Sequence, residues 1–68
     1  MAVAIVNGKR VRIPSPTTDD QIRQVGGIPR GRTLIRQDET GNYVIPPGTR
    51  VDVDDDDVFV DAPSRTKG

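Results

Sequence analysis

A run of acidic side chains near the end of the chain is the first place to look for chemistry. The run is Asp52-Val53-Asp54-Asp55-Asp56-Asp57, and clustered carboxylates can hold a hard cation such as calcium. An EF-hand loop needs glycine at its sixth position and glutamate at its twelfth, but these positions hold Asp57 and Pro63. The pattern therefore predicts no metal site. We interpret the run as a solvated turn that discourages edge-to-edge association. Replacing Asp54 to Asp57 should not lower stability, because clustered like charges repel.

Other charged groups have simple explanations. Asp19 and Asp20 stand where a helix is predicted to begin, and the helix dipole favours negative charge there. The segment Arg30-Gly31-Arg32 could grip phosphate, but the chain offers only Tyr43 and Phe59 as aromatic surfaces on which bases could stack. The net charge is zero, so we predict no nucleic-acid partner.

Histidine and cysteine are both absent from the chain. The commonest general base and the thiolate nucleophile are therefore missing, as are disulfides and thiolate metal ligands. No apolar run approaches the length of a membrane span. We expect a cytoplasmic protein that is not an enzyme, needs no cofactor or metal and has no membrane partner.

The charges are unevenly distributed along the chain. Residues 1–36 carry seven basic and two acidic side chains, whereas residues 37–61 carry one basic and eight acidic side chains. Such asymmetry could present faces of opposite sign to different partners. The simpler interpretation is a solvated surface on which opposite charges partly pair in the folded state.

One stretch, residues 16–29, predicts a helix. Thr18 can cap its start, with Gln21 completing a capping box three residues later. Gly26-Gly27 supplies a left-handed stop, and Pro29 prevents continuation. The predicted helix has only two to three turns by this spacing, which is too short to be stable alone, so it must pack on a sheet.

The apolar residues of this helix define the face that it should bury. Ile22 and Val25 lie three positions apart, and we predict that both are buried. Ile28 can fold back beneath them as the hydrophobic contact of the C-cap.

The first part of the chain predicts a β-hairpin. Asn7-Gly8 is a strong turn signal between residues 2–6 and 9–13. A two-residue turn, which we favour, places five apolar side chains of the two strands on the inner face: Ala2, Ala4, Val6, Val11 and Ile13. The same register leaves Val3, Ile5, Arg10 and Arg12 on the outer face. A three-residue loop with a glycine bulge would instead bring Val3 and Ile5 inside.

The rest of the chain predicts short extended segments and turns. The extended segments are residues 33–37, 43–45, 49–53 and 58–60. Residues 62–68 contain no large apolar side chain, so we predict a domain over residues 1–61 followed by a flexible tail over residues 62–68. One helix on one face of a mixed sheet defines an α+β roll, with the opposite face open to water or to a partner.

This arrangement resembles the ββαββ β-grasp fold of ubiquitin, and more closely the small bacterial ubiquitin-like domains of the multi-ubiquitin type. The residues that carry the resemblance are Val6-Asn7-Gly8-Lys9, Val11-x-Ile13-Pro14, Val25-Gly26-Gly27, Leu34-Ile35, and Asp55-Asp56-Asp57 before Phe59. It covers about residues 2–62 and rests on pattern and order. The chain departs from the family in ending Lys67-Gly68 rather than with two glycines, and in holding one domain rather than a tandem array.

The resemblance implies a protein modifier that is conjugated through the Gly68 carboxylate. Arg65, Thr66 and Lys67 would then thread the channel of an adenylating, activating enzyme, which would form an acyl-adenylate at Gly68. The implied partners are this enzyme, a transferase, a target protein and a deconjugating protease. A sulfur carrier would use the same carboxylate as a thiocarboxylate, but its usual tail ends in two glycines.

The resemblance also implies a binding patch on the outer sheet face. Ile35 resembles the isoleucine that anchors partners in ubiquitin, because Leu34 beside it should face the helix. With Val44, Val3 and Ile5 it would form an exposed apolar patch, although scattered surface aliphatics are also common. The alternative function is accordingly a noncovalent binding module that uses this face.

Overall fold

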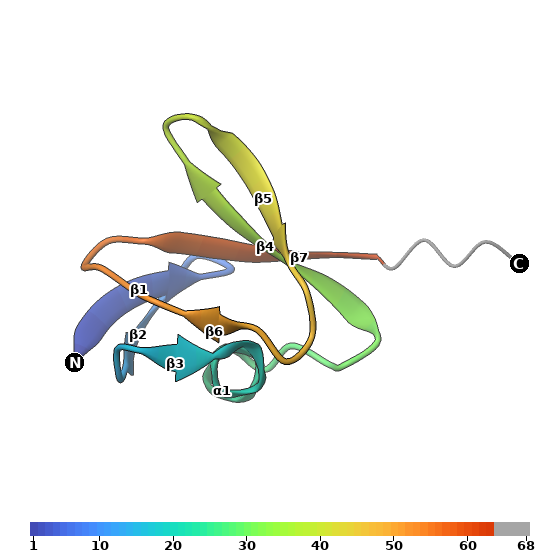
Figure 1. Cartoon of the computed structure of the whole chain (residues 1–68), viewed down its shortest axis with the longest axis horizontal. Helices are drawn as coiled ribbons and strands as arrows, with labels where there is room; N and C mark the ends of the chain where they lie inside the picture. Colours follow the sequence, from blue (N-terminus) through green and yellow to red (C-terminus); the bar gives the residue numbers. More distant parts are fainter. Residues whose placement is uncertain (64–68) are drawn as a thin grey trace, which may run out of the picture.

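The computed structural model describes residues 1–63, which form a small α+β fold with one helix packed on a mixed sheet. Its elements are β1 (Ala2–Val6), β2 (Lys9–Ile13), β3 (Thr17–Thr18), α1 (Asp19–Gly26), β4 (Arg32–Asp38), β5 (Gly41–Ile45), β6 (Arg50–Val51) and β7 (Val58–Pro63). In this part of the chain the large sheet has the order β2-β1-β7-β4-β5, and β3 pairs with β6 beside the helix (Figure 1). Only β1 and β7 run parallel among these strands. The architecture is compatible with a β-grasp fold.

The register of the first hairpin confirms the predicted two-residue turn. Val6 pairs with Lys9, and Ala4 pairs with Val11. Asn7 and Gly8 have φ angles of 50° and 81°, the left-handed conformation that this tight turn requires. The five side chains predicted for the inner face of the hairpin therefore face the helix, where Ala4 and Ile13 are fully buried.

Helix α1 begins and ends where the sequence predicts. The Thr18 hydroxyl accepts a hydrogen bond from the Gln21 N–H at 3.4 Å, and Gly27 adopts the left-handed conformation with φ of 71°. The Gly27 N–H donates to the Arg23 carbonyl. The Ile28 N–H donates to the same carbonyl at 2.8 Å, and Ile28 is buried beneath the helix as predicted.

The buried face of α1 differs from the predicted one. Ile22 is buried, but Val25 is 43% exposed, so its predicted burial is wrong. The helix instead buries Asp19 and Arg23 against neighbouring loops and turns Gly26 toward β1. Gly26 lies so close to β1 that a Cβ atom there would clash with Val6 Cγ1. This close approach fixes the rotation of the helix and leaves Val25, one position earlier, at its side.

The acidic run forms the exposed turn that was predicted, and it also makes contacts that the sequence did not predict. The Val3 N–H donates to Asp55 Oδ1 at 2.9 Å, and the Val3 carbonyl accepts from the Asp56 N–H at 2.7 Å. The side chain of Asp57 accepts from Arg36 Nη2 at 3.0 Å and from the Asp54 N–H at 2.8 Å. The turn thus binds the start of β1 and pairs with β4, so some of its carboxylates contribute to the fold.

The later strands also differ in length from the prediction. Strand β7 continues through Ala62 and Pro63, which pair with Thr33 and Arg32 of β4. The first residues of the predicted tail therefore belong to the sheet, because β4 is long enough to pair with them. Within the predicted extended segment 49–53, only Arg50–Val51 form a strand. Among residues 1–63, no helix is long and apolar enough to cross a membrane.

The two ends of the acidic turn should respond differently to loss of charge. Asp57→Ala removes an acceptor from the half-buried Arg36, whose buried Nε has no hydrogen-bond partner, and should cost about 1–3 kcal/mol. Asp54→Asn changes an exposed side chain and should stay within about 0.5 kcal/mol of the parent. Urea unfolding of both variants measures these changes. Equal stability of the two variants would contradict the structural role of Asp57.

Candidate functional site

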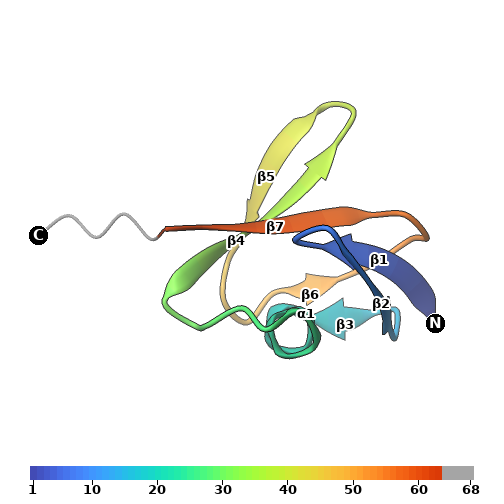
Figure 2. The same cartoon turned by 180° about the vertical axis from the view of Figure 1, so that it is seen from behind.

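The open face of the large sheet carries a row of aliphatic side chains. Helix α1 and strands β3 and β6 lie together on one side of this sheet (Figures 1 and 2). On the opposite side, register places Ile35 between Val44 and Val60, and places Ile5 beside Val58. We call this row the aliphatic stripe: Val3, Ile5, Val58, Val60, Ile35 and Val44. Five of its members are half-buried by their neighbours, and Val44 is 63% exposed.

The stripe brings together all four residues of the predicted patch. Val3 and Ile5 come from β1, Ile35 from β4 and Val44 from β5. The structure adds Val58 and Val60, which fill the gap between β1 and β4 and which the sequence analysis did not include. The alternation of these two valines about the fully buried Phe59 is the signal that would have found them.

One end of the aliphatic stripe is cationic. Arg10 and Arg12 of β2 pair with Ile5 and Val3 of β1 and therefore share their face. Arg10 lies 3.7 Å from Asp56, but both side chains are more than two-thirds exposed, so this pair contributes little to stability. A partner that covers the stripe would meet apolar side chains first and positive charge toward β2.

Strand β7, which leads toward the predicted conjugation site, is held on both sides. It pairs with β1 and with β4, and the Asn7 N–H donates to the Phe59 carbonyl at 2.9 Å. Near its end the Asp61 N–H donates to Asn7 Oδ1 at 3.2 Å, and the Asp61 carboxylate pairs with Arg32. The predicted conjugation residue and channel residues, which are Gly68, Arg65, Thr66 and Lys67, lie outside the described residues.

The electrostatics at the end of β7 favour an ionised carboxylate. Desolvation by burial raises the pKa of Asp61, but hydrogen bonds from Arg32 and Asn7, with the charge of Arg32, outweigh it and lower the pKa overall. Asp61 therefore remains charged across the neutral range and keeps its bond to Arg32. This pair fixes the end of β7 to the start of β4.

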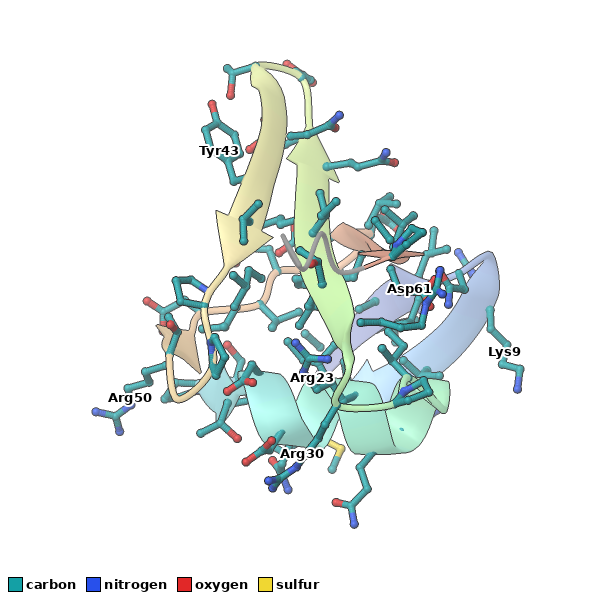
Figure 3. The ribbon with its side chains drawn as sticks, turned by 90° about the vertical axis from the view of Figure 1, so that its right-hand side faces the viewer. Lys9, Arg23, Arg30, Tyr43, Arg50 and Asp61 are labelled. Atoms are coloured by element: carbon teal, nitrogen blue, oxygen red, sulfur yellow. The ribbon has the colours of Figure 1, made fainter. Side chains whose placement is uncertain are left out.

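A buried ion pair positions β4 relative to the helix. Arg23 Nε lies 3.4 Å from Asp19 Oδ2, and these side chains are only 7% and 2% exposed. Arg23 Nη1 donates to the carbonyls of Pro29 at 3.0 Å and Arg32 at 2.6 Å, and Figure 3 shows Arg23 between α1 and β4. Asp19 Oδ1 accepts from the Gly48 N–H at 2.7 Å. Asp19 is therefore more than a helix-start charge.

The surface hollows of the described residues offer no evident chemistry. Three open grooves of about 240 to 290 Å³ are lined by mixed charges and short apolar side chains. No cluster of three or more histidine, cysteine or carboxylate side chains in residues 1–63 could hold a metal ion. The geometry therefore points to the aliphatic stripe as the candidate site.

Two arginine–aspartate pairs of the helix, one buried and one exposed, test whether the buried pair holds the fold. Arg23→Ala should leave Asp19 charged and uncompensated in the interior and should cost about 3–5 kcal/mol. Arg30→Ala breaks a pair with Asp20 whose side chains are 85% and 59% exposed, and should cost less than about 1 kcal/mol. Guanidinium unfolding compares the two directly. A small effect of Arg23→Ala would mean that the pair does not hold the fold.

Comparison with known proteins found no family model, no curated protein and no solved structure that matches this chain.

Proposed function

We propose that this protein is a ubiquitin-like modifier of a bacterial conjugation system, attached to its target through the Gly68 carboxylate. The observation that carries the proposal is the position of β7 between β1 and β4. Strand β7 pairs with β1 at Val58 and Phe59 and with β4 along its whole length, which gives the following segment a fixed base. The α+β architecture is compatible with the β-grasp fold on which the resemblance depends.

The proposed chemistry takes place on partner enzymes rather than on this chain. The Gly68 carboxylate attacks the α-phosphorus of ATP in an adenylating enzyme, forming an acyl-adenylate and releasing pyrophosphate. A transferase then passes the acyl group to an amine or another nucleophile on the target, and AMP leaves. A protease would reverse the attachment. Glycine suits the reacting position because it has no Cβ to obstruct the adenylate.

In this proposal the chain contributes the length of its last residues, which enter the enzyme's channel, and the positive charge of Lys67. Residues 64–68 can span at most about 16 Å at ~3.3 Å per residue, which sets the depth of the channel that they can enter. Lys67 precedes the reacting carbonyl, so the channel must accept a long cationic side chain, for which an acidic wall is suited. Arg65 and Thr66 would lie in the same channel of the activating enzyme.

Deletion of Gly68 tests the modifier proposal. The intact protein should support ATP–pyrophosphate exchange by its adenylating enzyme, and the deletion should abolish it because Lys67 would place a side chain and a charge beside the adenylate. Thermal melting should be the same for both proteins, since the deletion lies outside the described fold. Equal exchange with both proteins, or none with either when the enzyme is competent, would refute the proposal.

A second candidate function is noncovalent protein binding through the aliphatic stripe. The observation that favours it is the uncovered row of six aliphatic side chains across β1, β7, β4 and β5. Contiguous apolar surface of this kind is typical of interaction sites. This function needs no activation of Gly68.

Substitution in the stripe separates the two functions. Ile35→Asp places a charge in the middle of the stripe and should abolish partner binding under this second function, whereas Val25→Asp on the exposed side of α1 should not. Melting curves identify loss of fold, and Ile35→Ser serves as a milder variant. Calorimetric titration of the partner measures binding. Undiminished binding by a folded Ile35→Asp or Ile35→Ser protein would exclude the stripe as the interface.

A further inference from the structure

The two edge strands of the large sheet differ in how they are protected. Strand β2 carries Lys9, Arg10 and Arg12 among its five residues. Charged side chains on an edge strand hinder the addition of another strand. Strand β5, whose sequence is GNYVI, has neither a charge nor a proline. Its edge is therefore open to pairing, whereas the opposite edge is guarded.

Strand β5 also exposes a large apolar side chain on each of its two faces, because Tyr43 shares the face of Arg36 and Val44 shares the open face with Ile35. Tyr43 is 49% exposed and Val44 is 63% exposed. Within residues 1–63 no strand pairs with the outer edge of β5, and the β4–β5 hairpin projects away from the helix (Figure 1). A groove of about 290 Å³ lies beside the strand, and its lining combines apolar side chains with charged ones, among them Tyr43, Ile45, Asp38 and Arg50. The unpaired backbone edge of β5 is therefore flanked by an exposed apolar side chain on each face of the sheet.

Charges of opposite sign mark the two ends of this edge. Asp38 and Glu39 lie in the turn that precedes β5. Hydrogen bonds from the Thr40 hydroxyl and N–H lower the pKa of Asp38, so this end stays negative. Arg50 lies beyond the C-terminal end of β5, past the arrowhead of this strand in Figure 3. In an antiparallel pair of two β5 strands, the negative end of one copy would lie beside the positive end of the other.

We infer that β5 is a self-association edge, along which two copies pair antiparallel about a twofold axis. Backbone hydrogen bonds would join the two sheets, and Val44 of each copy would pack against Val44 of the other on the open face, with Tyr43 of each copy on the opposite face. A five-residue edge buries less than the roughly 1,200 Å² of a stable interface, so the dimer is weak and forms only at high concentration. This inference is independent of the proposed function.

Sedimentation velocity of the full chain over a micromolar to millimolar series tests the inference. The parent protein should show reversible dimers, and Val44→Lys should weaken association roughly tenfold or more, because it replaces an apolar cross-strand contact with two like charges. The matched control Val25→Lys makes the same change on α1, far from the β5 edge, and should associate like the parent. Amide shifts in NMR spectra should change with concentration at residues 41–45.

Charge exchange across the edge gives a second and independent measurement. Glu39→Arg alone should place like charges at both ends of the dimer, and Arg50→Glu alone should do the same, so each variant should associate severalfold more weakly than the parent. A mixture of the two variants restores both opposite-charge contacts and should form a heterodimer of parental strength. A monomeric parent across the whole series would overturn the inference, as would equal dimerisation of Val44→Lys and Val25→Lys. Failure of the mixture to exceed either variant alone would overturn the twofold antiparallel arrangement.

Discussion

The ion pair between Asp19 and Arg23 is the interaction on which the position of the helix depends. Its two side chains are almost completely removed from water, which is costly unless every charged group finds partners. Asp19 accepts from Gly48, and Arg23 donates to the carbonyls of Pro29 and Arg32. The pair therefore joins the helix to the turn before β6 and to the loop before β4.

Further ion pairs link the basic first half of the chain to the acidic second half. Arg32 pairs with Asp61, Arg36 with Asp57, and Arg10 with Asp56. The uneven charge distribution along the sequence is therefore partly neutralised in the fold, as the simpler interpretation proposed. The first two pairs are half-buried and connect β4 to β7 and to the acidic turn. Without disulfides, these contacts supplement a core that a chain of 68 residues can make only modestly large.

The distribution of side chains over the two sheet faces is unusual along β4. Arg32, Leu34 and Arg36 share the face toward the helix, where both arginines pair with aspartates, whereas Ile35 lies on the open face. The open face thus holds aliphatic side chains, although water surrounds it. Such an arrangement is favourable when another apolar surface covers it. The aliphatic stripe and the uncharged β5 edge meet at Val44, so an association along β5 would extend the stripe into the second copy.

Local signals in the sequence determined the hairpin, the helix ends and the class of the fold. Asn7-Gly8, Thr18 and Gly27 act through backbone conformation and hydrogen bonds to near neighbours, which the sequence displays directly. The resemblance implied that Ile35, Val44, Val3 and Ile5 would share the open face under the two-residue hairpin turn, and the strand register places all four on that face.

Tertiary structure decided the features that depend on contacts between distant segments. Gly26 packs against Val6, and this approach rotated Val25 out of the core. Asp19 and Arg23 entered the interior because backbone groups far along the chain satisfy them. The acidic turn became structural because Val3 and Arg36 lie beside it, at sequence separations that no local pattern encodes. Pairing with β4 likewise drew Ala62 and Pro63 into the sheet, since a strand ends where its partner does.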